Sequence, residues 1–173
     1  MYLFKFILIS LLIATPAKED WVRIKGDKQM SFLFPSRGQH SKKNIGNIPS
    51  WIFQTKNVTC VFGVVCTQLL KEKGQLDSYT LQQLYVRMKK ESVSMPTARL
   101  KSEKTILHKN MDIKEICYTI IKNKHEMTYY KQFIFRDNCM YQVTIGAPTS
   151  LMRELEAQKE KFFNSVQFDD KGL

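Results

Sequence analysis

Two cysteines, Cys60 and Cys66, lie in the apolar run NVTCVFGVVCTQ, and cysteine thiolates can bind metals, exchange disulfides or act as nucleophiles. The run predicts a β-strand, on which Cys60, Phe62, Val64 and Cys66 share one face. At about 3.3 Å per residue the two cysteines are about 20 Å apart, which excludes a mutual disulfide or a shared metal ion. No C-x-x-C motif is present, so a thioredoxin-type redox pair is not indicated.

The other two cysteines, Cys117 and Cys139, fall in two further predicted strands. If turns at 123–126 and 137–138 join three consecutive strands, Cys117 faces residue 132 and lies two strands away from Cys139. A bridge between these two is therefore not expected. Two alternatives remain: all four cysteines are buried thiols, or disulfides join Cys60 or Cys66 to Cys117 or Cys139.

The remaining residue types that support catalysis are present without a matching motif. His40, His108 and His125 have no second ligand at the spacing of a zinc site, so we predict no metal and no other cofactor. The serines occur outside any G-x-S-x-G motif, and Ser150 is interpreted as a helix cap. Asp112 and Glu115 are close in sequence, but nothing opposes them across a cleft. We expect the chain not to be an enzyme.

Charge is the most unusual feature of the composition, with 27 Lys and Arg against 16 Asp and Glu and a formal net charge of +11. Such a balance attracts anionic polymers, anionic lipid or nucleic acid. It also solubilises a surface, and the basic residues are spread along the chain. The polar, turn-rich segment 36–49 predicts a long exposed loop, and it supplies the candidate binding residues Arg37, His40, Lys42 and Lys43.

Residues 1–17 predict a cleaved signal peptide, because an apolar run from Phe6 to Ala14 follows Lys5 and ends at the small-residue exit Ala14-Thr15-Pro16-Ala17. The run is about half of the roughly 20 residues that a spanning helix requires. We therefore expect a periplasmic or secreted protein with no membrane span after cleavage, and one domain at residues 18–173.

The elements that would position these residues are mainly strands. Asp77 or Ser78 predicts a helix start, and apolar residues at i, i+3, i+4 and i+7 predict a helix over 78–92. A second helix is expected after Pro148, with Gln167-Phe168 ending the ordered chain. The predicted strands are 21–25, 30–34, 50–56, 58–69, 105–108, 115–122, 127–136 and 139–145.

Short connections among the last strands make the predicted sheet mainly antiparallel, so the fold class is α+β. Asp137-Asn138 is expected to form a two-residue hairpin turn. On the strand 127–136, Tyr129, Lys131 and Phe133 share one face, a mixture that can bind nucleic acid, but the apolar content of both faces favours core instead. No specific nucleic acid partner is therefore expected.

Four segments in this order, MSFLFPS, CVFGVVCTQ, FIFRDNCMYQVTIGAP and EKFFNSVQF, resemble small secreted bacterial proteins of the PsbP-like fold. The fold is named after an extrinsic protein of photosystem II, and the resemblance covers roughly residues 21–168. It implies an α-β-α sandwich in which a mainly antiparallel sheet is flanked by helices. It carries no catalytic residue to this chain, because the shared motifs are core and turn features.

Together these observations predict a secreted or periplasmic, non-enzymatic domain that works by binding. The predicted partner is an envelope protein or an anionic envelope polymer, held by the basic segment 36–49. Two alternatives are a carrier of a small apolar ligand between sheet and helix, and a hydrolase with a site assembled from distant residues.

Overall fold

The computed structural model describes residues 20–45, 48–69, 76–108 and 111–169, so the predicted signal peptide lies outside the described residues. The large sheet is fully antiparallel and has the order β3-β4-β5-β9-β8-β7-β6; a small sheet has the order β1-β2-β10. The strands are β1 Val22–Lys25, β2 Met30–Phe34, β3 Gln39–Ile45, β4 Ile48–Lys56, β5 Val61–Gln68, β6 Arg99–His108, β7 Met111–Lys122, β8 His125–Arg136, β9 Cys139–Pro148 and β10 Gln167–Phe168; the helices are α1 Ser78–Ser92, the 3₁₀ turn η1 Thr149–Leu151 and α2 Met152–Asn164.

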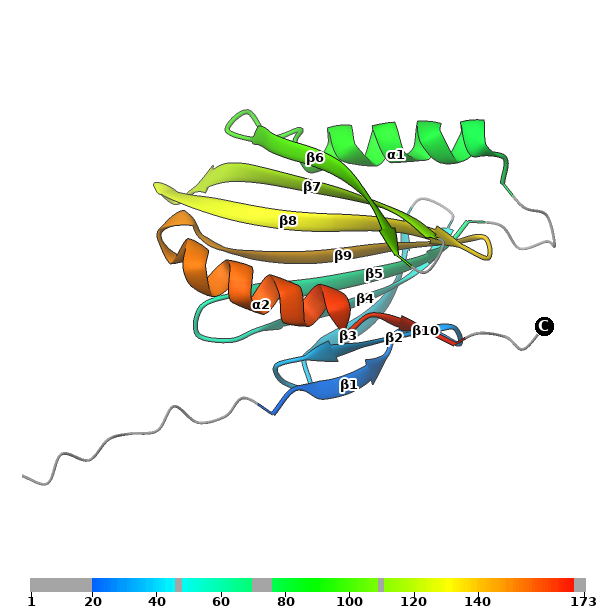
Figure 1. Ribbon diagram of the computed structural model, residues 1–173, viewed down its shortest axis with the longest axis horizontal. Helices are drawn as coiled ribbons and strands as arrows, with labels where there is room; N and C mark the ends of the chain where they lie inside the picture. Colours follow the sequence, from blue (N-terminus) through cyan, green and yellow to red (C-terminus); the bar gives the residue numbers. More distant parts are fainter. Residues whose placement is uncertain (1–19, 46–47, 70–75, 109–110, 170–173) are drawn as a thin grey trace, which may run out of the picture.

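The large sheet is covered on both faces, as Figure 1 shows. Helix α1 packs on one face through Tyr85 and Met88, against side chains of β7, β8 and β9. Helix α2 and the small sheet cover the other face, where most of the core lies. The predicted α+β class and the mainly antiparallel sheet flanked by helices are therefore confirmed.

Helix α1 begins where the sequence predicts. The Asp77 carboxylate accepts a hydrogen bond from the backbone N–H of Thr80 at 2.8 Å. This bond and the other hydrogen bonds from the first turn stabilise the charged carboxylate and so lower the pKa of Asp77. Lys89 and Lys90 lie in the last turn, at the negative end of the helix dipole. The predicted range 78–92 is confirmed.

The hairpins are built on two-residue turns. Asp137 and Asn138 join β8 to β9 with φ of 48° and 59°, as predicted. Asn123 and Lys124 join β7 to β8 with φ of 51° and 67°, so this turn is tighter than the predicted 123–126. The register shifts accordingly, and Cys117 lies opposite Tyr130 rather than residue 132.

Two predictions about local structure were wrong, and a third was incomplete. Segment 36–49 is not a long loop, because β3 occupies Gln39–Ile45 and pairs along its whole length with β4. Ser150 does not cap α2, which has no side-chain cap and follows directly from η1. The predicted strand 105–108 is the end of the longer β6, whose remaining residues are exposed and lack an apolar alternation.

The predicted strand 58–69 is shorter in the structure, where β5 begins at Val61 and leaves Cys60 outside it. Asn57 folds residues 57–60 into a turn, since its side-chain oxygen accepts the backbone N–H groups of Thr59 at 3.1 Å and Cys60 at 2.7 Å. Strand β5 then runs between β4 and β9 at the centre of the sheet, which confirms the predicted interior strand.

Candidate functional site

The basic residues of the segment 36–49 lie on and beside β3, at one edge of the large sheet. Alternation along the strand divides them between two faces. His40 and Lys42 lie opposite Phe53 and Trp51 of β4, on the face that also carries the small sheet, whereas Lys43 lies opposite Ser50 on the other face. The four predicted residues therefore do not form one cluster; Arg37, His40 and Lys42 can act together, and Lys43 cannot join them.

A groove of about 380 Å³ lies where β3 and β4 meet the small sheet. Its floor is apolar, and its rim is formed by exposed cationic and polar side chains. We call it the basic–aromatic groove; it is lined by Ile24, Lys25, Gly26, Phe34, Arg37, Gly38, Gln39, His40, Trp51 and Phe53.

Aromatic rings and cations are in direct contact at this site. The imidazole of His40 stacks on Phe53, with ring centroids 6.2 Å apart and an interplanar angle of 26°. The ammonium of Lys42 lies 5.2 Å from the centroid of the Trp51 ring, next to the groove. Among the described residues, no carboxylate forms an ion pair with Lys25, Arg37 or Lys42. These positive charges are therefore available to an anion from solution.

Gly38 lets the chain pass close to β4 at this point. Its φ is +30°, and a Cβ at this position would lie 2.5 Å from the backbone oxygen of Gln54. A side chain at this position would therefore meet the backbone of β4. The close approach brings the entry of β3, between Arg37 and His40, against β4.

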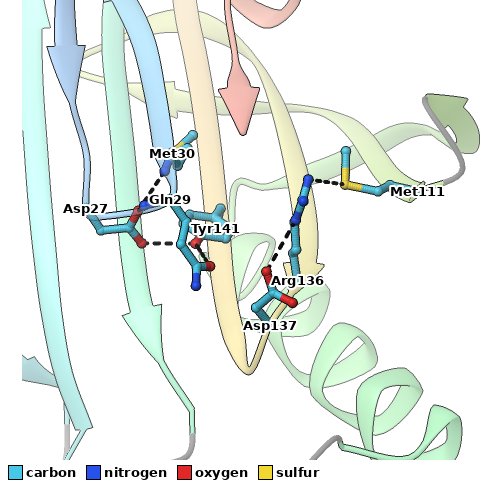
Figure 2. Close-up of polar contacts among 7 residues, drawn as sticks. All are labelled: Asp27, Gln29, Met30, Met111, Arg136, Asp137 and Tyr141. Atoms are coloured by element: carbon cyan, nitrogen blue, oxygen red, sulfur yellow. Dashed lines mark hydrogen bonds and ion pairs between the residues drawn. The ribbon is translucent and has the colours of Figure 1, made fainter. Parts of the chain in front are cut away.

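The turn between β1 and β2 forms the opposite wall of the groove and is tied to the large sheet by the contacts drawn in Figure 2. One oxygen of Asp27 accepts the backbone N–H groups of Gln29 at 2.7 Å and Met30 at 2.8 Å. The other accepts the hydroxyl of Tyr141 of β9 at 2.9 Å. Tyr141 is fully buried, and burial together with the nearby Asp27 raises the pKa of its hydroxyl. The small sheet is thus held by a satisfied polar contact at the end that carries Lys25.

None of the four cysteines lines this groove. Cys60, directly before β5, and Cys66 of β5 are buried in the same core cluster, and the Cys66 sulfur is 3.9 Å from the sulfur of Met30. Burial raises the pKa of the Cys66 and Cys117 thiols, which disfavours the reactive thiolate. The two alternatives left by the sequence, buried thiols or disulfides that join Cys60 or Cys66 to Cys117 or Cys139, stay predictions.

The two carboxylates that are close in sequence lie on opposite faces of β7. Asp112 is exposed on one face of β7, whereas Glu115 is buried on the other face, where Lys104 lies 3.1 Å away and the Gln132 amide donates at 2.8 Å. Within the described ranges, no three His, Cys, Asp or Glu side chains are grouped as metal ligands. In the same ranges no helix has the length and apolar character to cross a membrane.

A second cavity bears on the alternative of an apolar ligand between sheet and helix. It measures about 240 Å³ and lies between β6, β7, β8 and the end of α2, lined mainly by Ile, Met and Phe side chains with Arg136 and His108. Typical small-molecule sites have volumes of about 300–1,000 Å³. Two of the four predicted binding residues, Arg37 and His40, line the basic–aromatic groove, and none lines this cavity.

No protein-family profile matches the chain, and no curated protein matches it. Solved structures do match the chain. Cyanobacterial PsbP from Synechocystis sp. PCC 6803 aligns with a TM-score of 0.60 and 8% identity, over 91% of this chain and 98% of that one. LpqN of Mycobacterium tuberculosis, described as involved in cell envelope biogenesis, aligns at 0.49 with 10% identity, over 86% and 90% of the two chains. A Pseudomonas aeruginosa protein of unknown function aligns at 0.46 with 12% identity, over 71% and 93%.

The likeness to cyanobacterial PsbP covers nearly the whole of both chains at very low sequence identity. Such a likeness concerns the fold and not the activity. It agrees with the sheet order, the two helices on opposite faces and the resemblance that the sequence motifs indicated. The chain therefore has the PsbP-like fold.

Proposed function

We propose that this protein is a secreted or periplasmic binding domain, without catalytic activity, that holds an anionic envelope polymer in the basic–aromatic groove. The observation that carries the proposal is the pairing of cations with aromatic rings at the groove, His40 on Phe53 and Lys42 on Trp51. The N-terminal segment with the pattern of a signal peptide supports the location.

The chemistry of the groove fits an acidic polysaccharide better than a bare polyanion. Carboxylate groups of uronic acids can pair with Arg37 and Lys42, and the apolar face of a sugar ring can lie on Trp51, which lines the groove. Arginine is suited to this role because its guanidinium donates two parallel hydrogen bonds to one carboxylate. A neutral glucan offers the rings without the charges.

Salt dependence tests this proposal with a defined probe. We expect the protein to bind alginate, a uronic acid polymer, and to lose roughly tenfold in affinity between about 50 mM and about 200 mM salt, because bound cations release condensed counterions. Dextran, a neutral polymer, is expected not to bind. Trp51 provides the signal, in a Trp21→Phe variant that removes the other tryptophan.

Two results would contradict a polyanion site. The first is equal binding of alginate and dextran, and the second is an alginate affinity that does not change with salt. An envelope fraction passed over the immobilised protein tests the alternative partner: if proteins are retained at both salt concentrations while alginate fails to bind, the partner is an envelope protein.

A further inference from the structure

Helix α1 covers only part of its face of the large sheet, where it contacts β6, β7, β8 and the start of β9 (Figure 1). On the remainder of this face, over β4, β5 and β9, an open groove of about 750 Å³ follows the strands. We call it the open-face groove. It is lined by Gly38, Gln39, Ile52, Phe53, Gln54, Thr55, Lys56, Val61, Phe62, Gly63, Val65, Lys122, Tyr129 and Thr144.

The floor of the open-face groove contains a glycine that the fold does not require. Gly63 lies in the middle of β5, between Gln54 of β4 and Thr144 of β9. A Cβ built on Gly63 would meet only the backbone oxygen of Phe53, at 3.9 Å, which is ordinary contact. A glycine inside a strand weakens it, and such a residue often marks the close approach of a ligand. Here the missing side chain deepens the groove.

An aromatic wall closes one side. The ring of Tyr129 lies against Gly146 of β9, where any Cβ would overlap the ring, so this second glycine is required by packing. Tyr129 is also stacked on Tyr118 of β7, with ring centroids 5.5 Å apart and an interplanar angle of 17°. The wall is therefore held in place by neighbours on both sides. Val61, which is 40% exposed, and Val65 offer apolar surface beside it.

The charges around this groove have one sign. Lys56 and Lys122 line it and are both exposed. The sequences of β3, β4, β5 and β9 contain no aspartate or glutamate, so no acidic side chain from these strands opposes the lysines. An occupant with an apolar body and a negative group complements this surface.

We propose that the open-face groove binds a small anionic amphiphile, a single-chain carboxylate. Its hydrocarbon chain lies over Gly63 and against Ile52, Val65 and Tyr129, and its carboxylate is directed to the end of the groove that carries Lys56 and Lys122. The two grooves meet at Gly38, Gln39 and Phe53, but they open on opposite faces of the sheet, because Ile52 and Gly63 lie on the opposite face from Trp51.

The test uses dodecanoate below its micelle concentration, titrated into the full chain by calorimetry. We expect one site, whose affinity rises about twofold for each methylene added from octanoate to dodecanoate. A fully buried methylene would raise the affinity about fourfold, and the groove is open on one side. Dodecyltrimethylammonium, which has the same chain and the opposite charge, is expected to bind at least tenfold more weakly.

Two sets of variants locate the site. Gly63→Leu fills the floor and is expected to weaken dodecanoate binding at least fiftyfold while the thermal unfolding midpoint stays the same or rises. Gln68→Leu, an exposed position of β5 outside the groove, is the control. Lys56→Met with Lys122→Met is expected to weaken binding about tenfold, whereas Lys101→Met on β6 has no effect.

Three outcomes would overturn the proposal. The first is that Gly63→Leu binds dodecanoate as well as the wild type does. If Gly63→Leu does not fold, unchanged binding in the variant with both lysine substitutions has the same meaning. The second is equal binding of the cationic amphiphile. The third is a wild-type dimer in sedimentation that Gly63→Leu makes monomeric, with no uptake of dodecanoate, since the face would then be an interface between two copies of the chain.

Discussion

Phe162→Ala is expected to lower the free energy of unfolding by about 3–5 kcal/mol, the largest effect of any single change considered. Phe162 of α2 is fully buried, and its ring centroid is 5.2 Å from that of Phe62 of β5 and 5.7 Å from that of Phe34 of β2. It therefore joins the helix, the large sheet and the small sheet. Truncation leaves a cavity among these rings that they cannot fill without moving.

Urea denaturation followed by circular dichroism measures this effect. Glu160→Ala, an exposed position on the same helix, is the matched control and should change stability by less than about 0.5 kcal/mol. Because Phe34 also lines the basic–aromatic groove, the variant should lose alginate binding at urea concentrations where the wild type still binds. A loss of stability below about 1 kcal/mol would show that α2 is not part of the core.

Lys131→Met is expected to stabilise the protein at pH 7 by about 2–3 kcal/mol. The Lys131 side chain lies beneath α1, where its ammonium donates to the hydroxyl of Ser92 at 3.0 Å and lies 5.9 Å from the Phe133 ring centroid. Burial lowers the pKa of Lys131 from its ordinary value of 10.5 to about 8, while Glu91 partly opposes this shift. Methionine keeps the length of the side chain and removes the buried charge.

The sign of the pH dependence follows from proton binding. Between pH about 8 and 10.5 the unfolded chain holds a proton at Lys131 that the folded chain has lost, so the wild type gains stability as the pH rises through this window. The advantage of Lys131→Met should therefore shrink from pH 8 upwards and be small near pH 10.5. Tyrosines with raised pKa values are common to both proteins and cancel in the difference.

Denaturation of both proteins at pH 7, 8, 9 and 10 provides the check, with Lys90→Met, an exposed position of α1, as the control for a surface charge. A difference between the wild type and Lys131→Met that stays constant across this range would contradict a lysine buried in its neutral form at high pH.

Local signals in the sequence were sufficient to predict helix α1 and the interior position of strand β5. The helix was predicted from Asp77 and the periodic apolar residues after it, and the structure places its first residue directly after that cap. The interior position of β5 followed from apolar residues on both faces, which only a strand between neighbours can bury. In both cases the information lies within one element.

Strand β3 could not be predicted in the same way. Its sequence QHSKKNI has neither an apolar alternation nor β-branched residues before its last position, and the surrounding glycines and prolines are typical of a loop. What makes it a strand is the pairing of each residue from Gln39 to Ile45 with β4. A polar edge strand with Lys42 and Lys43 on opposite faces is also a common protection against edge-to-edge association.

The two grooves, like the strands, were predictable only where the signal lies within one segment of the sequence. Arg37, His40 and Lys42 were predicted from charge, but the aromatic floor from Trp51 and Phe53 was missed, because it depends on the register between two strands. The open-face groove was missed because it depends on how far α1 extends across the sheet. One signal for it was present: Gly63, a glycine in the middle of an apolar strand.

The most direct test of the central claim compares two neighbouring lysines that differ only in the face of β3 on which they lie. Alginate is titrated into Lys42→Gln and Lys43→Gln, each in the Trp21→Phe background, with Trp51 emission as the signal. We expect Lys42→Gln to weaken binding about fivefold, through loss of a charge beside the groove and its contact with Trp51. Lys43→Gln removes the same charge from the opposite face and should weaken binding less than about twofold. Equal losses in the two variants would show that net charge alone attracts the polymer, and that the basic–aromatic groove is not its site.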